Sequence, residues 1–195
     1  MERANDRESA VTSPLTRLIL ALGLPLAAFL AGGAWMMKIT GRGKFPETAA
    51  PESVPLHFRL GGYAAADVRA YWDCLGADGQ LAELRFLNLD LLFPLLYGGT
   101  LLLGLFLLWN GLGRPFPRCR LMAPVFVNLI ADWTENLALR GQLRRFLEDE
   151  TIQEGWIALA GVATTVKILC FAFAWLLLLG LGLRWIRRRG EGARG

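Results

Sequence analysis

Four polar residues inside an apolar stretch are the part of this sequence best suited to chemistry. Asn128, Asp132, Glu135 and Asn136 lie at positions i, i+4, i+7 and i+8, so a helix places them all on one face. The surrounding stretch, 121–140, is long and apolar enough to cross a bilayer. Ionisable side chains are costly at membrane depth, and they are kept where they are paired between helices and serve a function. The pattern therefore predicts an intramembrane polar site.

Two other apolar stretches each contribute an ionisable residue, Lys167 in one and Asp90 in the other, and Tyr97 follows Asp90 at i+7 on the same helical face. At a rise of about 1.5 Å per residue, Asp132 lies about 12 Å and Lys167 about 16 Å below the outer face of the membrane. Asp90 and Glu135 lie at only about 6–8 Å by the same measure. We therefore expect a deep pair of Asp132 with Lys167. We also expect a shallow pair of Asp90 with Glu135.

Three carboxyl groups share one ammonium in this predicted site. Burial and like-charge repulsion both disfavour the ionised carboxylate, so at least one of the three is expected to keep its proton near neutral pH. Such a group can act as an acid, carry a proton or donate a hydrogen bond. No catalytic role is assigned. The candidate ligand-binding or proton-linked residues are Asp90, Tyr97, Asn128, Asp132, Glu135, Asn136 and Lys167.

A structural explanation of the same residues stays open. Buried ion pairs can simply fix the register of packed helices, and buried asparagines often hydrogen-bond one helix to the next. Tyr97 and Trp133 are typical packing residues. His57, the single histidine, is expected to be a solvated loop residue. The small residues Ala160, Ala163 and Thr164 share a face with Lys167 and favour close helix packing.

The elements that position these residues are predicted to be membrane helices. Of the 195 residues, 54% are hydrophobic, and four stretches are each long enough to span the hydrocarbon core. The predicted fold class is all-α, a four-transmembrane-helix bundle. The predicted divisions are an N-terminal tail at 1–14, a membrane domain at 15–184 with spans at 15–37, 86–109, 121–139 and 156–183 and an outer connection at 38–85, and a basic tail at 185–195.

The outer connection is predicted to begin as an irregular loop and to continue as a short amphipathic helix at 64–75. Val68, Tyr71 and Trp72 recur at helical spacing on its apolar face. Gly76 is expected to end this helix, and Asp78-Gly79 to form a turn. We expect the helix to lie on the outer surface and cap the bundle, with an ordinary packed helix as the alternative.

Arginines predict the orientation of the chain. They gather before the first span, between the second and third spans, and after the fourth, which places both termini in the cytoplasm. The expected location is a plasma membrane, the inner membrane of a bacterium. The first span could instead be a cleaved signal peptide, but the acidic Glu2, Asp6 and Glu8 do not suit one. Four tryptophans fall near span ends, as interfacial residues do: Trp35, Trp109, Trp156 and Trp185.

Several functional classes are disfavoured. The net charge of +4 comes from arginines at span ends, and no nucleic-acid-binding motif is present. Cys74, Cys119 and Cys170 form no Cys-x-x-Cys pair and are expected to stay unpaired, which argues against a disulfide oxidoreductase. A single loop histidine argues against a haem protein. We expect no metal and no cofactor.

Several motifs resemble those of a group of uncharacterised four-helix bacterial integral membrane proteins. The resemblance covers roughly residues 15–184 and depends on Gly62-Tyr63, Asp90-x-x-Phe93-Pro94-x-x-Tyr97, Asp132-x-x-Glu135-Asn136 and Lys167 in the last helix. It implies the four-helix fold but no activity. The sequence departs from the pattern after Gly79, where Gln80 and Glu83-Leu84 stand in place of an arginine and a tyrosine.

Two functions remain compatible with the sequence. In the first, the site binds a lipid-like or amphipathic small molecule. In the second, the chain is a non-catalytic structural or partner subunit whose polar residues hold the bundle together; the protein partner is unknown. A cavity would favour the first function, and a solid core with fully paired charges would favour the second.

Overall fold

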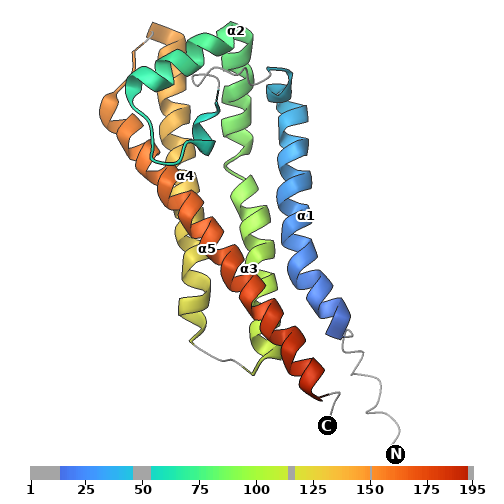
Figure 1. The fold of residues 1–195 in the computed structure, drawn as a ribbon. Coiled ribbons are helices and arrows are strands. Elements are labelled where there is room, and N and C mark those ends of the chain that lie inside the picture. Colours follow the sequence, from blue (N-terminus) through green and yellow to red (C-terminus); the bar gives the residue numbers. More distant parts are fainter. Residues whose placement is uncertain (1–13, 46–53, 114–116, 150, 193–195) are drawn as a thin grey trace, which may run out of the picture.

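The chain is all-helical over the residues described by its computed structural model, which are 14–45, 54–113, 117–149 and 151–192. Five α-helices and two short 3-10 turns occupy this part of the chain, with no strand among them, which confirms the all-α class (Figure 1). Most of the predicted N-terminal tail, and residues 46–53 of the predicted loop, lie outside the described residues. The elements are α1 (Pro14–Thr40), η1 (Arg42–Lys44), η3 (Leu56–Phe58), α2 (Ala65–Leu89), α3 (Phe93–Gly111), α4 (Arg118–Asp149) and α5 (Glu154–Gly192).

Three of the described helical segments are long and apolar enough to cross a membrane: Leu15–Thr40, Phe93–Gly111 and Glu154–Gly190. Helix α4 contains the predicted third span but is not among them, because its polar stripe and charged ends lower its hydropathy. Helices α4 and α5 also run well past the predicted spans, at 32 and 39 residues. The basic segment after residue 184 is therefore largely helical.

The long helices run side by side, and α2 covers one end of them (Figure 1). Helix α1 begins and α5 ends at the opposite end of the bundle. Helix α1 packs against α3 and α5 packs along α4. Close packing of α1 depends on small residues: Gly104 of α3 faces the backbone of Ala21, and a Cβ at Gly32 would lie 2.6 Å from the Phe93 ring.

The predicted span at 86–109 is not one helix. Helix α2 ends at Leu89 and α3 begins at Phe93, with a turn between them. Pro94 explains the break, because proline has no N–H and its ring clashes with the carbonyl four residues earlier, that of Asp90. Proline fits well in the first turn of the new helix, where it lies. The break leaves backbone carbonyls near Asp90 without helical partners.

Helix α2 is two helical pieces joined at Gly76. The first piece is the predicted amphipathic helix, and Gly76 ends it with a left-handed φ of 64°. The chain then resumes a helix at once, so the predicted turn at Asp78-Gly79 is wrong. Gly79 is buried there against Leu75 and Phe45, so a side chain at this position would meet both residues.

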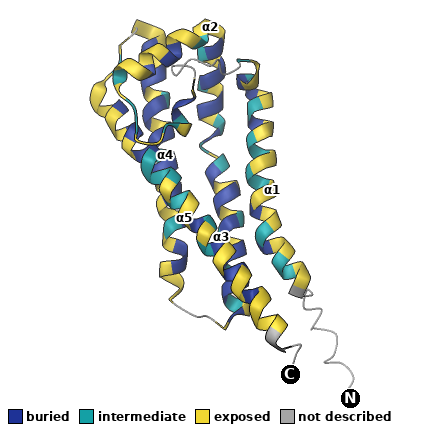
Figure 2. Cartoon of the chain, in the orientation of Figure 1, coloured by how far each residue is buried: buried dark blue, intermediate teal, exposed yellow. Residues whose placement is uncertain are grey.

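The interior contains two apolar clusters with polar residues between them. The cluster near the start of α1 includes Leu105, Leu178, Trp109 and Trp185. Both tryptophans are under 10% exposed, so they are packing residues rather than interfacial ones. The other cluster packs the first piece of α2, through Tyr71, Val68 and Trp72, on α4 and α5. The short helix is therefore packed on the bundle through its apolar face. Figure 2 shows large exposed areas along the outer faces of α1 and α5.

Candidate functional site

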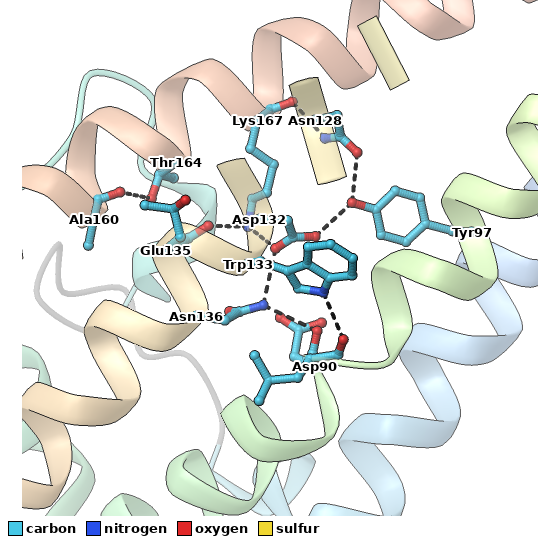
Figure 3. A network of polar contacts seen from close by, with 12 residues as sticks. Asp90, Tyr97, Asn128, Asp132, Trp133, Glu135, Asn136, Ala160, Thr164 and Lys167 are labelled. Carbon is cyan, nitrogen blue, oxygen red and sulfur yellow. Dashed lines mark hydrogen bonds and ion pairs between the residues drawn. The ribbon is translucent and has the colours of Figure 1, made fainter. Parts of the chain in front are cut away.

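Helix α4 brings all four residues of its polar stripe into the interior. Asn128, Asp132, Glu135 and Asn136 are each no more than 3% exposed. This confirms that the i, i+4, i+7, i+8 pattern marks one buried face. The stripe lies between the two apolar clusters, where α4 packs along α5 and beside the start of α3 (Figure 3).

Lys167 of α5 contacts two carboxylates of α4. Its Nζ lies 3.2 Å from Oδ1 of Asp132, as predicted, and it also pairs with Glu135. Because Asp132 and Glu135 are one helical turn apart, a single flexible lysine reaches both. The predicted shallow pair of Asp90 with Glu135 is therefore wrong, since Glu135 turns toward Lys167 instead. The depth estimate could not separate these arrangements, because it ignored the length of the lysine side chain.

Tyr97 connects α3 to this pair. Its hydroxyl lies 2.6 Å from Oδ2 of Asp132 and 2.8 Å from Oδ1 of Asn128, so one hydroxyl hydrogen faces two acceptors. Asn128 is oriented by its own donor, since its Nδ2 donates to the backbone carbonyl of Lys167 at 3.0 Å. Three helices, α3, α4 and α5, therefore meet in one hydrogen-bonded network.

The break between α2 and α3 supplies acceptors on the other side of Asp132. Asn136 Nδ2 donates to Oδ1 of Asp132 and to the backbone carbonyl of Asp90, both at 3.2 Å. Trp133 Nε1 donates to the carbonyl of Leu91 at 2.9 Å. Figure 3 shows the side chains of Asn136 and Trp133 pointing toward the break beside Asp90. Trp133, which the sequence suggested was a packing residue, is thus part of the site.

Two carboxyl groups of the site have unused acceptor capacity. Glu135 is fully buried, and its Oε1 has no hydrogen-bond partner among the described residues. The neighbouring Thr164 donates its hydroxyl hydrogen to the carbonyl of Ala160. The side chain of Asp90 is 7% exposed, and no ion pair reaches it within the described part of the chain. The amide of Asn136, which also contacts Asp132, is the hydrogen-bond donor beside the Asp90 carboxyl.

Residues 56–63, which we name the outer cover, lie against this end of α5. The Tyr63 hydroxyl is 3.1 Å from Oγ1 of Thr164, and the backbone N–H of Gly61 donates to Thr165 at 3.3 Å. The close approach requires glycine on both sides, because a Cβ at Gly62 would lie 3.3 Å from the carbonyl carbon of Gly161. Burial, followed by the charge of Glu135, raises the pKa of Tyr63 above its usual range.

His57 belongs to the outer cover and is not a solvated loop residue. Its ring stacks on Phe86 with a centroid distance of 5.5 Å, and the side chain is half-buried. Burial, together with the positive charges of Lys167 and Arg42, lowers the pKa of His57 to about 3. The neutral imidazole is therefore the form that the fold accommodates, and no sequence pattern indicated the contact of His57 with Phe86.

A second buried polar cluster, Arg42 with Tyr71 and Glu83, was missed in the sequence. Nε of Arg42 lies 2.6 Å from Oε2 of Glu83, and the guanidinium also donates to the Tyr71 hydroxyl at 2.6 Å. Both charged side chains are 3% exposed or less. Burial raises the pKa of Glu83 despite this pairing. The cluster fastens η1 to α2, and the only sequence signal was an acidic residue inside an otherwise helical apolar pattern.

Across the described ranges, no three His, Cys, Asp or Glu side chains converge closely enough to hold a metal ion. Asp90, Asp132 and Glu135 are thus arranged around the network rather than around a single point. Their chemistry is that of hydrogen-bond acceptors and negative charge.

Comparison with known proteins assigns no relative. No protein-family model matches the chain, and neither the curated proteins nor the solved structures include a significant match. The resemblance to four-helix bacterial membrane proteins therefore stays a prediction.

Proposed function

We propose that this chain is a multi-pass integral membrane protein whose buried polar site binds a lipid-like or amphipathic small molecule. The observation that carries the proposal is a buried set of three carboxyl groups, Asp90, Asp132 and Glu135, of which the ammonium of Lys167 contacts the last two. Uncompensated buried carboxylates are costly, and intramembrane ionisable groups of this kind generally mark function.

We count four membrane spans, which are the three apolar segments and α4. Helix α4 is included because it packs along α5 and turns the charged residues of its polar stripe inward. Large apolar side chains remain exposed along the outer faces, including Leu30 and Trp35 of α1 and Val162 and Leu176 of α5. Lipid chains would cover such faces. Arginine-rich segments lie before the first span, between the second and third spans, and after the fourth, and they support cytoplasmic termini. We propose a bacterial inner membrane.

An amphipathic ligand suits the surroundings of the site. The polar network lies between two apolar clusters, and Leu92 in the break beside Asp90 is 63% exposed on the outer surface. A ligand could therefore place a polar head against the carboxyls while its chain follows the apolar exterior.

A structural or partner subunit remains the second candidate function, and one observation favours it. Lys167 pairs with two carboxylates, while Asn128, Trp133 and Asn136 link α4 to its neighbours. Such a network can hold the bundle together without any ligand.

Mass spectrometry of small molecules that co-purify with the protein in mild detergent separates the two functions. We expect a bound amphipathic molecule in the wild type, its loss in Asp132→Asn, and its retention in Asp73→Asn, where the aspartate is exposed on α2. Size-exclusion chromatography selects the folded fraction of each variant before analysis. If the folded wild type carries nothing beyond what Asp132→Asn carries, the binding function is wrong and the structural one is favoured.

A further inference from the structure

We infer that the ligand of this site carries an ammonium group, which the carboxyls of Asp90 and Glu135 bind beside Lys167. The inference rests on the proposed binding function and narrows it to one chemical class, cationic amphiphiles. It depends on the charges and acceptor atoms of the site.

The charges of the buried residues do not balance. Asp90, Asp132 and Glu135 are each at most 7% exposed, and within the described residues the ammonium of Lys167 pairs with Asp132 and Glu135 but not with Asp90. Arg42, the other buried cation, is held by Glu83 and Tyr71. An unpaired carboxylate is unfavourable in a low-dielectric interior, so a carboxyl of this site either keeps its proton or takes up a further positive charge, and a cationic ligand supplies that charge.

The acceptor atoms point to the same group. Oε1 of Glu135 is buried and faces no cation, with the neutral Thr164 beside this carboxyl, and the Asp90 carboxyl has the neutral Asn136 beside it and receives no ion pair. An ammonium supplies three N–H donors and one positive charge, whereas a hydroxyl head supplies a single donor and no charge. A carboxylate head would add to the repulsion. A metal ion is disfavoured because the described acidic side chains do not converge on one point.

The helix break adds partial negative charge beside these carboxyls. The carbonyls of Asp90 and Leu91 left the helical ladder at the turn before Pro94, and each receives one side-chain donor. Unwound backbone at membrane depth commonly coordinates cations in membrane transport proteins. The same Asn136 amide contacts the Asp90 carbonyl and Asp132, so the carbonyl lies close to the carboxylates.

Probes of one chain length test the charge of the head group directly. Dodecylamine, dodecanol and dodecanoic acid are added at equal mole fraction to the protein in non-ionic detergent, and thermal unfolding is followed. We expect dodecylamine to raise the Tm by about 5–10 °C when it is in hundredfold excess over its Kd. The alcohol and the acid should raise it by far less. Asp90→Asn and Glu135→Gln should each remove the advantage of the amine, and the exposed control Asp73→Asn should keep it.

Each outcome separates this inference from the broader proposal. If dodecanol stabilises the wild type as strongly as dodecylamine, the inference is wrong but amphiphile binding stands. If dodecylamine produces no shift, or the shift survives both carboxyl variants, the inference is overturned. If ethylamine protects as well as dodecylamine, the ammonium is recognised, and the lipid-like part of the proposed function is what fails.

Discussion

Asp132 is the residue on which the buried network converges. Its two carboxylate oxygens accept hydrogen bonds from Lys167 of α5, Asn136 of α4 and the hydroxyl of Tyr97 of α3. Charge-assisted hydrogen bonds of this kind are stronger than neutral ones, and a partner left without a donor in the interior is costly. Changes around Asp132 should therefore reduce stability more than equivalent changes at the edge of the site.

Tyr97→Phe tests this expectation with the loss of one oxygen atom. The variant leaves Oδ2 of Asp132 and Oδ1 of Asn128 without their tyrosine contact, and we expect a loss of about 1–3 kcal/mol in the free energy of unfolding. Tyr63→Phe is the matched control, since its hydroxyl contacts only the neutral Thr164 in a partly buried place. Equal losses in urea unfolding of the two variants would contradict a central position for Asp132.

His57 should make the protein less stable in mild acid. Its pKa of about 3 in the folded chain lies below the unfolded value, so the unfolded state binds a proton first as the pH falls. The stabilisation is complete above about pH 6.5 and is lost below it, by about 1–2 kcal/mol at pH 5. Unfolding of wild type and His57→Phe at pH 7 and pH 5 measures the difference. A pH dependence that is identical in the two proteins would show that His57 is solvated after all.

The outer cover is the element whose fit depends most on backbone geometry. Gly61 and Gly62 both have positive φ, at 98° and 83°, and both approach α5, but an added Cβ would meet α5 only at Gly62. Alanine is strained at either position, and at Gly62 it must also displace the backbone of Gly161.

Gly62→Ala should therefore lower the Tm in detergent by several degrees more than Gly61→Ala does. The two variants share the strain of a positive φ, so their difference reports the contact with α5. Limited proteolysis of the outer cover provides a second measurement, with faster cleavage expected in Gly62→Ala. Equal behaviour of the two variants would mean that the outer cover does not pack on α5.

The local sequence pattern was enough to predict some of these elements. Contacts between residues distant in the sequence could not be predicted from it. The stripe from Asn128 to Asn136 and the face of Val68, Tyr71 and Trp72 repeat at helical spacing, so both were predicted with the correct side buried. Pro94 disfavours an uninterrupted helix, but the residue type alone does not tell a bend from a complete break. The pairing of Arg42 with Glu83 joins residues 41 positions apart, and no periodicity reports such a contact.

The molecule as a whole has a polar end with its outer cover and an opposite end where α1 begins and α5 terminates (Figure 1). The arginine asymmetry predicts that this second end faces the cytoplasm. Two exposed cysteines mark the two ends, Cys74 in the first piece of α2 and Cys119 at the start of α4.

Labelling of single-cysteine variants from each side of the membrane tests the orientation. A membrane-impermeant maleimide added to intact cells should modify Cys74 before it modifies Cys119. Inverted vesicles should give the reverse order. Labelling of Cys74 from the cytoplasmic side alone would overturn the topology, and the outward position of the polar site with it.

The most direct test of the account is a double-mutant cycle on Asp132 and Lys167, whose charged atoms lie 3.2 Å apart. Asp132→Asn and Lys167→Met should each cost about 3–5 kcal/mol of stability in detergent, because each leaves a buried charge without its partner. The double variant should recover part of that loss, giving a coupling energy of about 0.5–3 kcal/mol. A double-variant loss equal to the sum of the single losses would show that the two residues are uncoupled, and it would contradict the claim that they belong to one intramembrane site.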